Sequence, residues 1–254
     1  MAAVGPQAPR HFGPRRLTAG DTRRYRVMWW AVRLLVGSLF RVRVEGLDHW
    51  PAAPFCIVLN HHNAWDPLIV IAAVPPTPRI TWFGPRVGVE DFERDPKYRL
   101  MQFFGGAIPI DPEKASLTSA VRTVRGVFAA GGVLGIFAEG HGFFRESALE
   151  PFEEGALSFA TAADVPVVPG VVVGTTYLWW GKRLRVSFGE PIPTHGVRGA
   201  DARASLSEQV RAAMIAMLPR HEPRAPARQP LRGFLTDLFH GPEDVARRVA
   251  ELGD

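Results

Sequence analysis

A pair of histidines and an aspartate stand close together in the first third of the chain, within the segment Asn60–Pro67. Asn60 alone separates His61 from the short apolar run Phe55–Leu59, and Asp66 directly precedes a second apolar run. Histidine is the side chain most easily poised as a general base near neutral pH, and an aspartate bonded to one ring nitrogen fixes its tautomer. The His61-x4-Asp66 spacing therefore predicts a base and its orienting carboxylate at a strand end, where ligands of open α/β sheets bind.

Structural roles are also open to the same residues. An aspartate followed by proline is a common helix start, with Asp66 as the N-cap and Pro67 at the first helical position. His61 and His62 would then be hydrogen-bonded loop histidines. A metal site at these three side chains lacks the usual helical spacing of ligands, and we expect no metal here.

Three further segments combine glycine with chemistry-bearing or apolar residues. They are Gly105–Asp111, Gly135–Gly142 and Val165–Val171. Glycine permits close backbone approach to a ligand, and the carboxylate of Glu139 at a strand end could bind an acceptor hydroxyl or a cation. Taken singly, each segment is most simply a turn or the entry into a buried strand.

Taken in order, these four segments resemble the glycerolipid acyltransferase family, whose best-known members are 1-acylglycerol-3-phosphate acyltransferases. The resemblance covers roughly residues 42–190 and extends to Val44–Leu47 before the first motif. It implies an O-acyltransferase of lipid biosynthesis that needs no cofactor. The fatty acyl group would pass from acyl-CoA or acyl carrier protein to a lipid hydroxyl, on lysophosphatidate or on another lysophospholipid or a glycolipid.

The resemblance also assigns roles to individual residues. His61 would deprotonate the acceptor hydroxyl, and Asp66 would orient it and stabilise the imidazolium. Glu139 and Gly140 match the family motif on the acceptor side. Pro169 and Gly170 match the motif that shapes the acyl pocket. Independently of any family motif, we expect backbone N–H groups at the helix start near residues 66–68 to stabilise the developing oxyanion.

The sequence departs from the family pattern where an acceptor phosphate would bind. Pro112 stands where the family has an arginine after its Ile-x-Ile-Asp strand, and His141 and Gly142 stand where it has Thr-Arg. A phosphate monoester calls for an arginine fork or equivalent donors, which Arg86, Arg145 or His141 could supply. A lysophospholipid with a masked phosphate, a glycolipid or another lipid alcohol fits these losses as well as lysophosphatidate does.

Two other classes of protein compete with this interpretation. The same segment spells His-His-x3-Asp, the signature of the chloramphenicol acetyltransferase superfamily, in which His62 would act; that motif is normally followed by glycine, and here Pro67 follows. A non-catalytic lipid-binding protein on the same fold is the second. A nucleic-acid binder would need basic residues on the domain itself, and the charge distribution described below does not provide them.

The elements that must position these residues alternate between strand and helix patterns, which predicts an α/β fold with a glycerolipid-acyltransferase-like sheet and flanking helices. The predicted strands span residues 42–44, 55–59, 80–83, 107–110, 133–137, 166–173 and 184–188. The predicted helices span residues 67–74, 92–104, 113–130, 152–163 and 201–218. By region, we expect a flexible tail at 1–21, a membrane-associating helix at 22–41, the acyltransferase domain at 42–218, and a linker with a short helical segment at 219–254.

Positive charge gathers at the front of this 254-residue chain. Residues 1–50 hold nine arginines and three acidic residues, whereas the whole chain has a formal net charge of +5, so the remainder is close to neutral. The paired Trp29 and Trp30 with flanking arginines suit an amphipathic helix lying in the membrane interface. They also suit a helix packed on the core, and the two are compatible. We therefore expect a peripheral or monotopic protein on the cytoplasmic face of a membrane.

Overall fold

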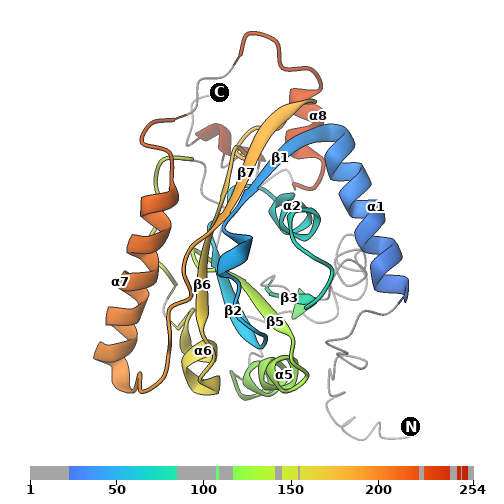
Figure 1. Ribbon diagram of the computed structural model, residues 1–254. Helices are drawn as coiled ribbons and strands as arrows, with labels where there is room; N and C mark the ends of the chain where they lie inside the picture. Colours follow the sequence, from blue (N-terminus) through green and yellow to red (C-terminus); the bar gives the residue numbers. More distant parts are fainter. Residues whose placement is uncertain are drawn as a thin grey trace, which may run out of the picture.

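The computed structural model describes most of the chain apart from the front tail, several internal stretches and the last four residues. The described residues are 23–84, 107–108, 117–140, 145–153, 155–222, 226–240, 245–246 and 248–250. Figure 1 shows a central twisted sheet with α1 and α2 on one side and α7 on the other. The predicted tail at 1–21 and the predicted helix at 92–104 lie outside the described residues.

Seven strands of the described part form one mixed sheet in the order β1-β7-β6-β2-β5-β3-β4. Their bounds are β1 Phe40–Glu45, β2 Phe55–Leu59, β3 Ile80–Phe83, β4 Ala107–Ile108, β5 Val133–Phe137, β6 Val167–Val173 and β7 Lys182–Phe188. Strands β6, β2, β5, β3 and β4 run parallel to one another, while β7 pairs antiparallel with β6 and parallel with β1. The carboxyl ends of β2, β5 and β6 therefore meet at one edge of the sheet, which β1 and β7 enter with their first residues.

Helices cover both faces of this sheet. Their bounds are α1 Arg23–Leu39, α2 Asp66–Ala73, α5 Leu117–Ala129, α6 Ser158–Ala163, α7 Gly199–Met217 and α8 Arg232–Asp237, with a 3-10 turn at Leu47–His49. One core cluster joins α1, α2 and α8 to the sheet, and a second joins α5, α6 and α7 to its other face. The predicted α/β fold with flanking helices is confirmed.

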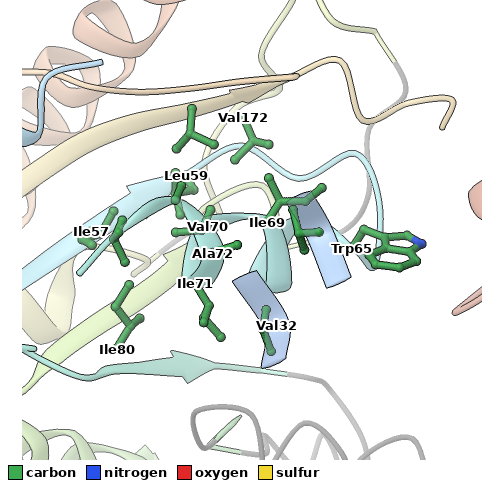
Figure 2. Close-up of a cluster of buried hydrophobic side chains, with 14 of the residues drawn as sticks. Val32, Ile57, Leu59, Trp65, Ile69, Val70, Ile71, Ala72, Ile80 and Val172 are labelled. Atoms are coloured by element: carbon green, nitrogen blue, oxygen red, sulfur yellow. The ribbon is translucent and has the colours of Figure 1, made fainter. Parts of the chain in front are cut away.

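The central strands are buried on both faces, which explains their uninterrupted apolar sequences. Every residue of β2 and of β6 is buried. Figure 2 shows how Ile57 and Leu59 of β2 pack with Ile69 of α2 and Val172 of β6, so that β2 and α2 are held together on either side of the loop that joins them. That loop carries His61 and Asp66.

Most strand predictions match the structure, whereas the predicted start of helix α6 is wrong. The strands predicted at 55–59, 80–83 and 133–137 coincide with β2, β3 and β5. A helix was expected over 152–163, but α6 begins only at Ser158. The backbone of Glu153 instead donates to Ala138 O over 2.8 Å, and Gly155 adopts a φ of 86°, so this stretch follows β5 before turning into the helix.

Helix α1 is shorter than expected and packs on the core through one stripe of residues. It ends at Leu39, and residues 40–41 belong to β1 rather than to a helix. Trp29 is buried, and its Nε1–H donates to Val74 O over 2.9 Å, whereas Trp30 is 59% exposed. Trp29 therefore belongs to the core, as the core-packing interpretation of this helix predicts, while Trp30 lies on the exposed side. Among the helices of the described part, none is long and apolar enough to span a bilayer.

Candidate active site

His61 and Asp66 meet in the loop between β2 and α2, which we call the 60–66 loop. His61 Nδ1 lies 2.9 Å from Asp66 Oδ2. The same carboxylate oxygen accepts the backbone N–H groups of His62 (2.7 Å) and Asn63 (2.8 Å). Asp66 is the first residue of α2 and Trp65 is its N-cap, and the other carboxylate oxygen of Asp66, Oδ1, has no hydrogen-bond partner among the described residues. The N-cap interpretation is therefore wrong, because the carboxylate turns back and organises the loop that precedes the helix.

These contacts determine the charge state of Asp66. Complete burial by itself acts to raise the pKa of its carboxyl group. The hydrogen bond from His61, the positive potential of His61 and His62 and the N–H of Asn63 outweigh burial, so the pKa of Asp66 lies below its ordinary value. An ionised Asp66 accepts the proton-bearing Nδ1 of His61, which leaves the lone pair on Nε2.

The His61 ring lies on an aromatic stack that holds its plane. Its centroid is 4.3 Å from that of Phe137, which stacks in turn on Trp82 at 5.1 Å. Gly135 makes room for this stack, because a Cβ there would come within 2.6 Å of the Trp82 ring. The His61 side chain is 26% exposed, and within the described residues its Nε2 has no hydrogen-bond partner. That nitrogen is available to a substrate.

His62 is in a different environment. It is buried, and Asn60 Nδ2 donates to its Nε2 over 2.7 Å. The same Nε2 is 3.7 Å from Glu146 Oε2. A buried imidazole whose Nε2 is already occupied does not fit the His-His-x3-Asp chemistry, in which His62 would take the proton of a substrate.

Asn60 anchors the start of the loop, a role that the sequence did not reveal. Its Nδ2–H donates to Val172 O over 2.9 Å, and its Oδ1 accepts Val172 N–H over 2.7 Å. The side-chain amide thus imitates a strand residue and continues the β2–β6 pairing beyond Leu59. The position of an asparagine directly before His61 was the available signal.

Glu139 holds the backbone of His61 through a hydrogen bond. It is buried, its Oε2 accepts His61 N–H over 2.9 Å, and its Oε1 accepts Glu150 N–H over 2.9 Å. Burial raises the pKa of Glu139, and the two N–H groups only partly counter this. Gly140 follows with a φ of 73°, and a Cβ there would meet Glu153 Cγ at 2.4 Å. Both oxygens of the predicted acceptor ligand Glu139 are therefore engaged with backbone N–H groups.

The remaining predicted positions are spread more widely. Pro169 and Gly170 lie in β6, inside the sheet, where a Cβ at Gly170 would come within 2.8 Å of Leu59 Cδ2. Arg145 is exposed and directly precedes the buried Glu146 near the 60–66 loop. The others, Arg86, Pro112, His141 and Gly142, lie outside the described residues.

The expected oxyanion donors at the start of α2 are not all available. The N–H of Asp66 donates to Asn63 O over 2.9 Å, and Pro67 has no N–H. The expectation is wrong for these two positions and leaves only Leu68 of the three.

Helix α8 packs on the far end of the 60–66 loop, a contact without any signal in the sequence. Trp65 Nε1–H donates to Leu235 O over 2.8 Å, and Asn63 Nδ2–H donates to Thr236 O over 3.2 Å. The Trp65 ring also packs on Phe239, with centroids 4.9 Å apart. The C-terminal segment thereby becomes part of the platform that carries His61.

An α/β sheet whose carboxyl edge carries a partly exposed histidine oriented by a buried aspartate defines a hydroxyl-activating type of site. The sequence profile of the acyltransferase family matches residues 41–173, which is more than half of the chain. The chain belongs to the acyltransferase family.

Individual proteins of this family extend the comparison. The 1-acyl-sn-glycerol-3-phosphate acyltransferases alpha of Ovis aries and Homo sapiens are each 29% identical to it over an alignment of 206 positions, which covers 75% of this chain. The chain spans 66% of the length of the sheep protein. In fold, it resembles the crystal structure of the 1-acyl-sn-glycerophosphate (LPA) acyltransferase PlsC from Thermotoga maritima, with a TM-score of 0.57, 17% identity, and coverage of 76% of this chain and 78% of the other.

Proposed function

We propose that the protein transfers a fatty acyl group from an acyl thioester to the hydroxyl group of a lipid acceptor. The observation that carries the proposal is His61, whose Nδ1 is held by buried Asp66 while its Nε2 faces an open side of the site. Family membership supplies the reaction class, and the names of the relatives supply a glycerolipid acceptor.

The chemistry follows from the two nitrogens of the ring. His61 Nε2 takes the proton of the acceptor hydroxyl as its oxygen attacks the thioester carbonyl, and Asp66 stabilises the imidazolium that forms. When the tetrahedral intermediate collapses, the C–S bond breaks and the imidazolium returns its proton to the departing thiolate. The products are an ester and a free thiol, and no acyl-enzyme forms. Glu139 acts as a positioning residue, because it fixes the backbone of His61.

The donor is acyl-CoA or acyl carrier protein, and the acceptor is a lysophospholipid, with lysophosphatidate as the family example. Pro112 and Gly142 replace the two arginines that the family uses for phosphate. An acceptor whose phosphate is already esterified, or a glycolipid, requires less positive charge at these positions. The exposed Arg145 is a described cation that could offer partial compensation.

The acceptor is a membrane lipid, so the protein works at a membrane surface, and we place it on the cytoplasmic face as a peripheral protein. The support lies in α1, where Val27, Trp30 and Leu34 are exposed at helical spacing and arginines flank them. Exposed apolar residues beside arginines suit the boundary between headgroups and acyl chains. Anionic lipids are concentrated on the cytoplasmic leaflet.

Release of free thiol from long-chain acyl-CoA, measured with vesicles and a panel of lipid acceptors, tests the reaction. We expect acceptor-dependent release by the purified protein and its loss in His61→Ala. His195→Ala is a matched control, because His195 also pairs with an aspartate at 2.8 Å but is 89% exposed. Equal activity of wild type and His61→Ala would contradict the mechanism. Lack of transfer with both acyl-CoA and acyl carrier protein would favour the lipid-binding alternative.

A further inference from the structure

Helix α8 presents apolar side chains to solvent. Leu231, Phe234 and Leu238 are all exposed, Phe234 by 63%, and they recur at a spacing that places them along one stripe of the helix. Leu231 adopts a left-handed φ of 60°, which bulky L-residues avoid. Leu235 is buried against the core. The helix is therefore anchored on one side and apolar on the side facing solvent.

Trp180 connects this stripe to the end of α1. Its ring is exposed, yet its Nε1–H donates to Ser38 O over 3.0 Å, and its backbone N–H donates to Pro230 O over 3.0 Å. Gly181 N–H in turn donates to Leu39 O over 2.7 Å. Figure 1 shows the same arrangement, with α8 next to the end of α1 and the first residues of β7. An exposed tryptophan thus connects the end of α1 to the residues just before α8.

Two neighbouring arginines lie close to Trp180 in the sheet. Arg41 of β1 and Arg183 of β7 are direct register partners on adjacent strands, and both are exposed. Within the described part of the chain, neither makes a hydrogen bond or an ion pair. Like charges directly opposite each other on a sheet are destabilising. An external anion at this position would relieve the repulsion.

We propose that these features, which we call the Trp180 corner, form a second membrane contact that binds an anionic lipid surface. The corner comprises Trp180, the stripe Leu231/Phe234/Leu238 and the pair Arg41/Arg183. It goes beyond α1, and it rests on the proposed function because that function places the protein at a membrane. A lipid surface accounts for both observations at once, since apolar side chains enter the headgroup boundary and arginines meet phosphates.

The position of the corner fits delivery of a lipid to the site. Strand β7 runs antiparallel to β6, so its first residues lie at the edge where β2 ends and His61 begins. The opposite side of α8 holds Trp65 and Asn63 in the 60–66 loop. Contact through α8 therefore brings the bilayer to the edge of the sheet that carries the candidate base.

A single fluorescent label at position 234 tests the contact directly. Cys56 is the one cysteine of the chain, it is fully buried, and burial raises the pKa of its thiol to about 12, so it does not compete for the label. We expect an environment-sensitive dye on Phe234→Cys to brighten and shift to the blue with phosphatidylcholine/phosphatidylglycerol vesicles. The same dye on Ile215→Cys, an exposed position on α7, should not respond. No response at position 234 would overturn the proposal.

Vesicle flotation of unlabelled variants separates the two parts of the corner. Phe234→Ser should weaken binding to anionic vesicles about tenfold, and Arg41→Gln with Arg183→Gln should do so by about tenfold or more. The matched controls on α7, Ile215→Ser and Arg203→Gln, should stay within about twofold.

Other outcomes have clear meanings. Unchanged vesicle binding in the Phe234 and arginine variants would reject the corner, and α1 alone would then be the contact. If the arginine variants instead lost only turnover with acyl carrier protein, the occupant would be an acidic protein and the proposal would be wrong. Acyl transfer in neutral detergent micelles is measured in parallel. Its absence would reject the proposed function without affecting the vesicle result.

Discussion

Two His–Asp pairs of almost equal length occur among the described residues, and only their surroundings distinguish them. His61–Asp66 measures 2.9 Å and His195–Asp164 measures 2.8 Å. Asp164 is 41% exposed, and exposed pairs contribute little to stability. Asp66 is buried and also holds two backbone N–H groups. Burial and additional hydrogen bonds, rather than the distance between the partners, therefore identify His61 as the oriented base.

Asp66→Asn should lose both activity and pH-dependent stability. Without the carboxylate, His61 loses its tautomer control, and acyl transfer should fall by about 10³-fold or more. Because the folded-state pKa of Asp66 lies below the unfolded value of about 3.9, its ionised form stabilises the fold above that pH. This contribution disappears as the pH falls through the folded-state pKa. Thermal unfolding from pH 7 to pH 3 should show a wild-type advantage that shrinks below about pH 4.

Asp164→Asn serves as the control for this series. The carboxylate of Asp164 is exposed in the wild type, so the melting temperature of the variant should follow that of the wild type across the pH range. A stability difference between wild type and Asp66→Asn that stayed constant down to pH 3 would contradict the argument.

Gly135→Ala should damage the aromatic stack under His61. The added Cβ would come within 2.6 Å of the Trp82 ring. Because Trp82 stacks on Phe137, the clash would also disturb the Phe137 ring. We expect a loss of about 2 kcal/mol in the free energy of unfolding, read from urea midpoints, together with lower acyl transfer. Gly126→Ala on α5 has open space around its Cβ and should be neutral or stabilising. Wild-type stability in Gly135→Ala would refute the packing argument.

At the scale of elements, apolar patterning was sufficient where burial alone decides the structure. Strands β2 and β5 were predicted at their full extent, because both faces of the sheet are covered and their apolar runs have clear ends. The start of α6 was missed, because the hydrogen bond of Glu153 to Ala138 is a tertiary contact that overrides helix propensity. For the Asp66 carboxylate, the sequence predicted the contact with His61 that the structure has, but it left the helix N-cap open as an alternative. A capping position and a loop-organising position have the same sequence, Asp-Pro.

The contact between α8 and the 60–66 loop is the least predictable part of the site. Residues 219–254 predicted only a linker and a short helix. The structure instead joins Thr236 to Leu178 through both backbone groups, since Leu178 N–H donates to Thr236 Oγ1 over 2.9 Å and the hydroxyl donates to Leu178 O over 3.2 Å. Trp65 and its acceptor Leu235 are 170 positions apart in the sequence. No local pattern encodes a pairing across that separation.

Thr236→Val should loosen α8 and with it the 60–66 loop. Valine keeps the shape but leaves the buried N–H and C=O of Leu178 without a partner, at a cost of about 2 kcal/mol. Because Thr236 is placed to act through the loop, turnover at saturating donor should fall more than the Michaelis constant changes. Thr236→Ser keeps the hydroxyl and should restore most of both stability and turnover. Equal kinetics in the valine and serine variants would show that α8 does not position the loop.

For the whole molecule, the sheet topology brings the candidate site and the Trp180 corner to the same edge. The 60–66 loop, α8 and the first residues of β1 and β7 all lie where the parallel strands end. Residues 1–50, which include α1 and Arg41, hold nine arginines against three acidic residues and so account for the net positive charge of the chain. A neutral domain with one basic, partly apolar end is suited to approach an anionic surface in a single orientation.

Acyl transfer should therefore depend on salt only when the acceptor is presented in an anionic membrane. Attraction between exposed arginines and headgroups is screened beyond about 10 Å at 0.1 M salt and about 3 Å at 1 M. On phosphatidylglycerol-containing vesicles, we expect the rate to fall about tenfold between these concentrations, whereas in neutral detergent micelles it should change less than about twofold. The micelle rate isolates the chemistry at His61, which is short-range and partly buried. Equal salt sensitivity in both systems would assign the effect to the site itself. The positive charge of the front end would then have no role in membrane docking.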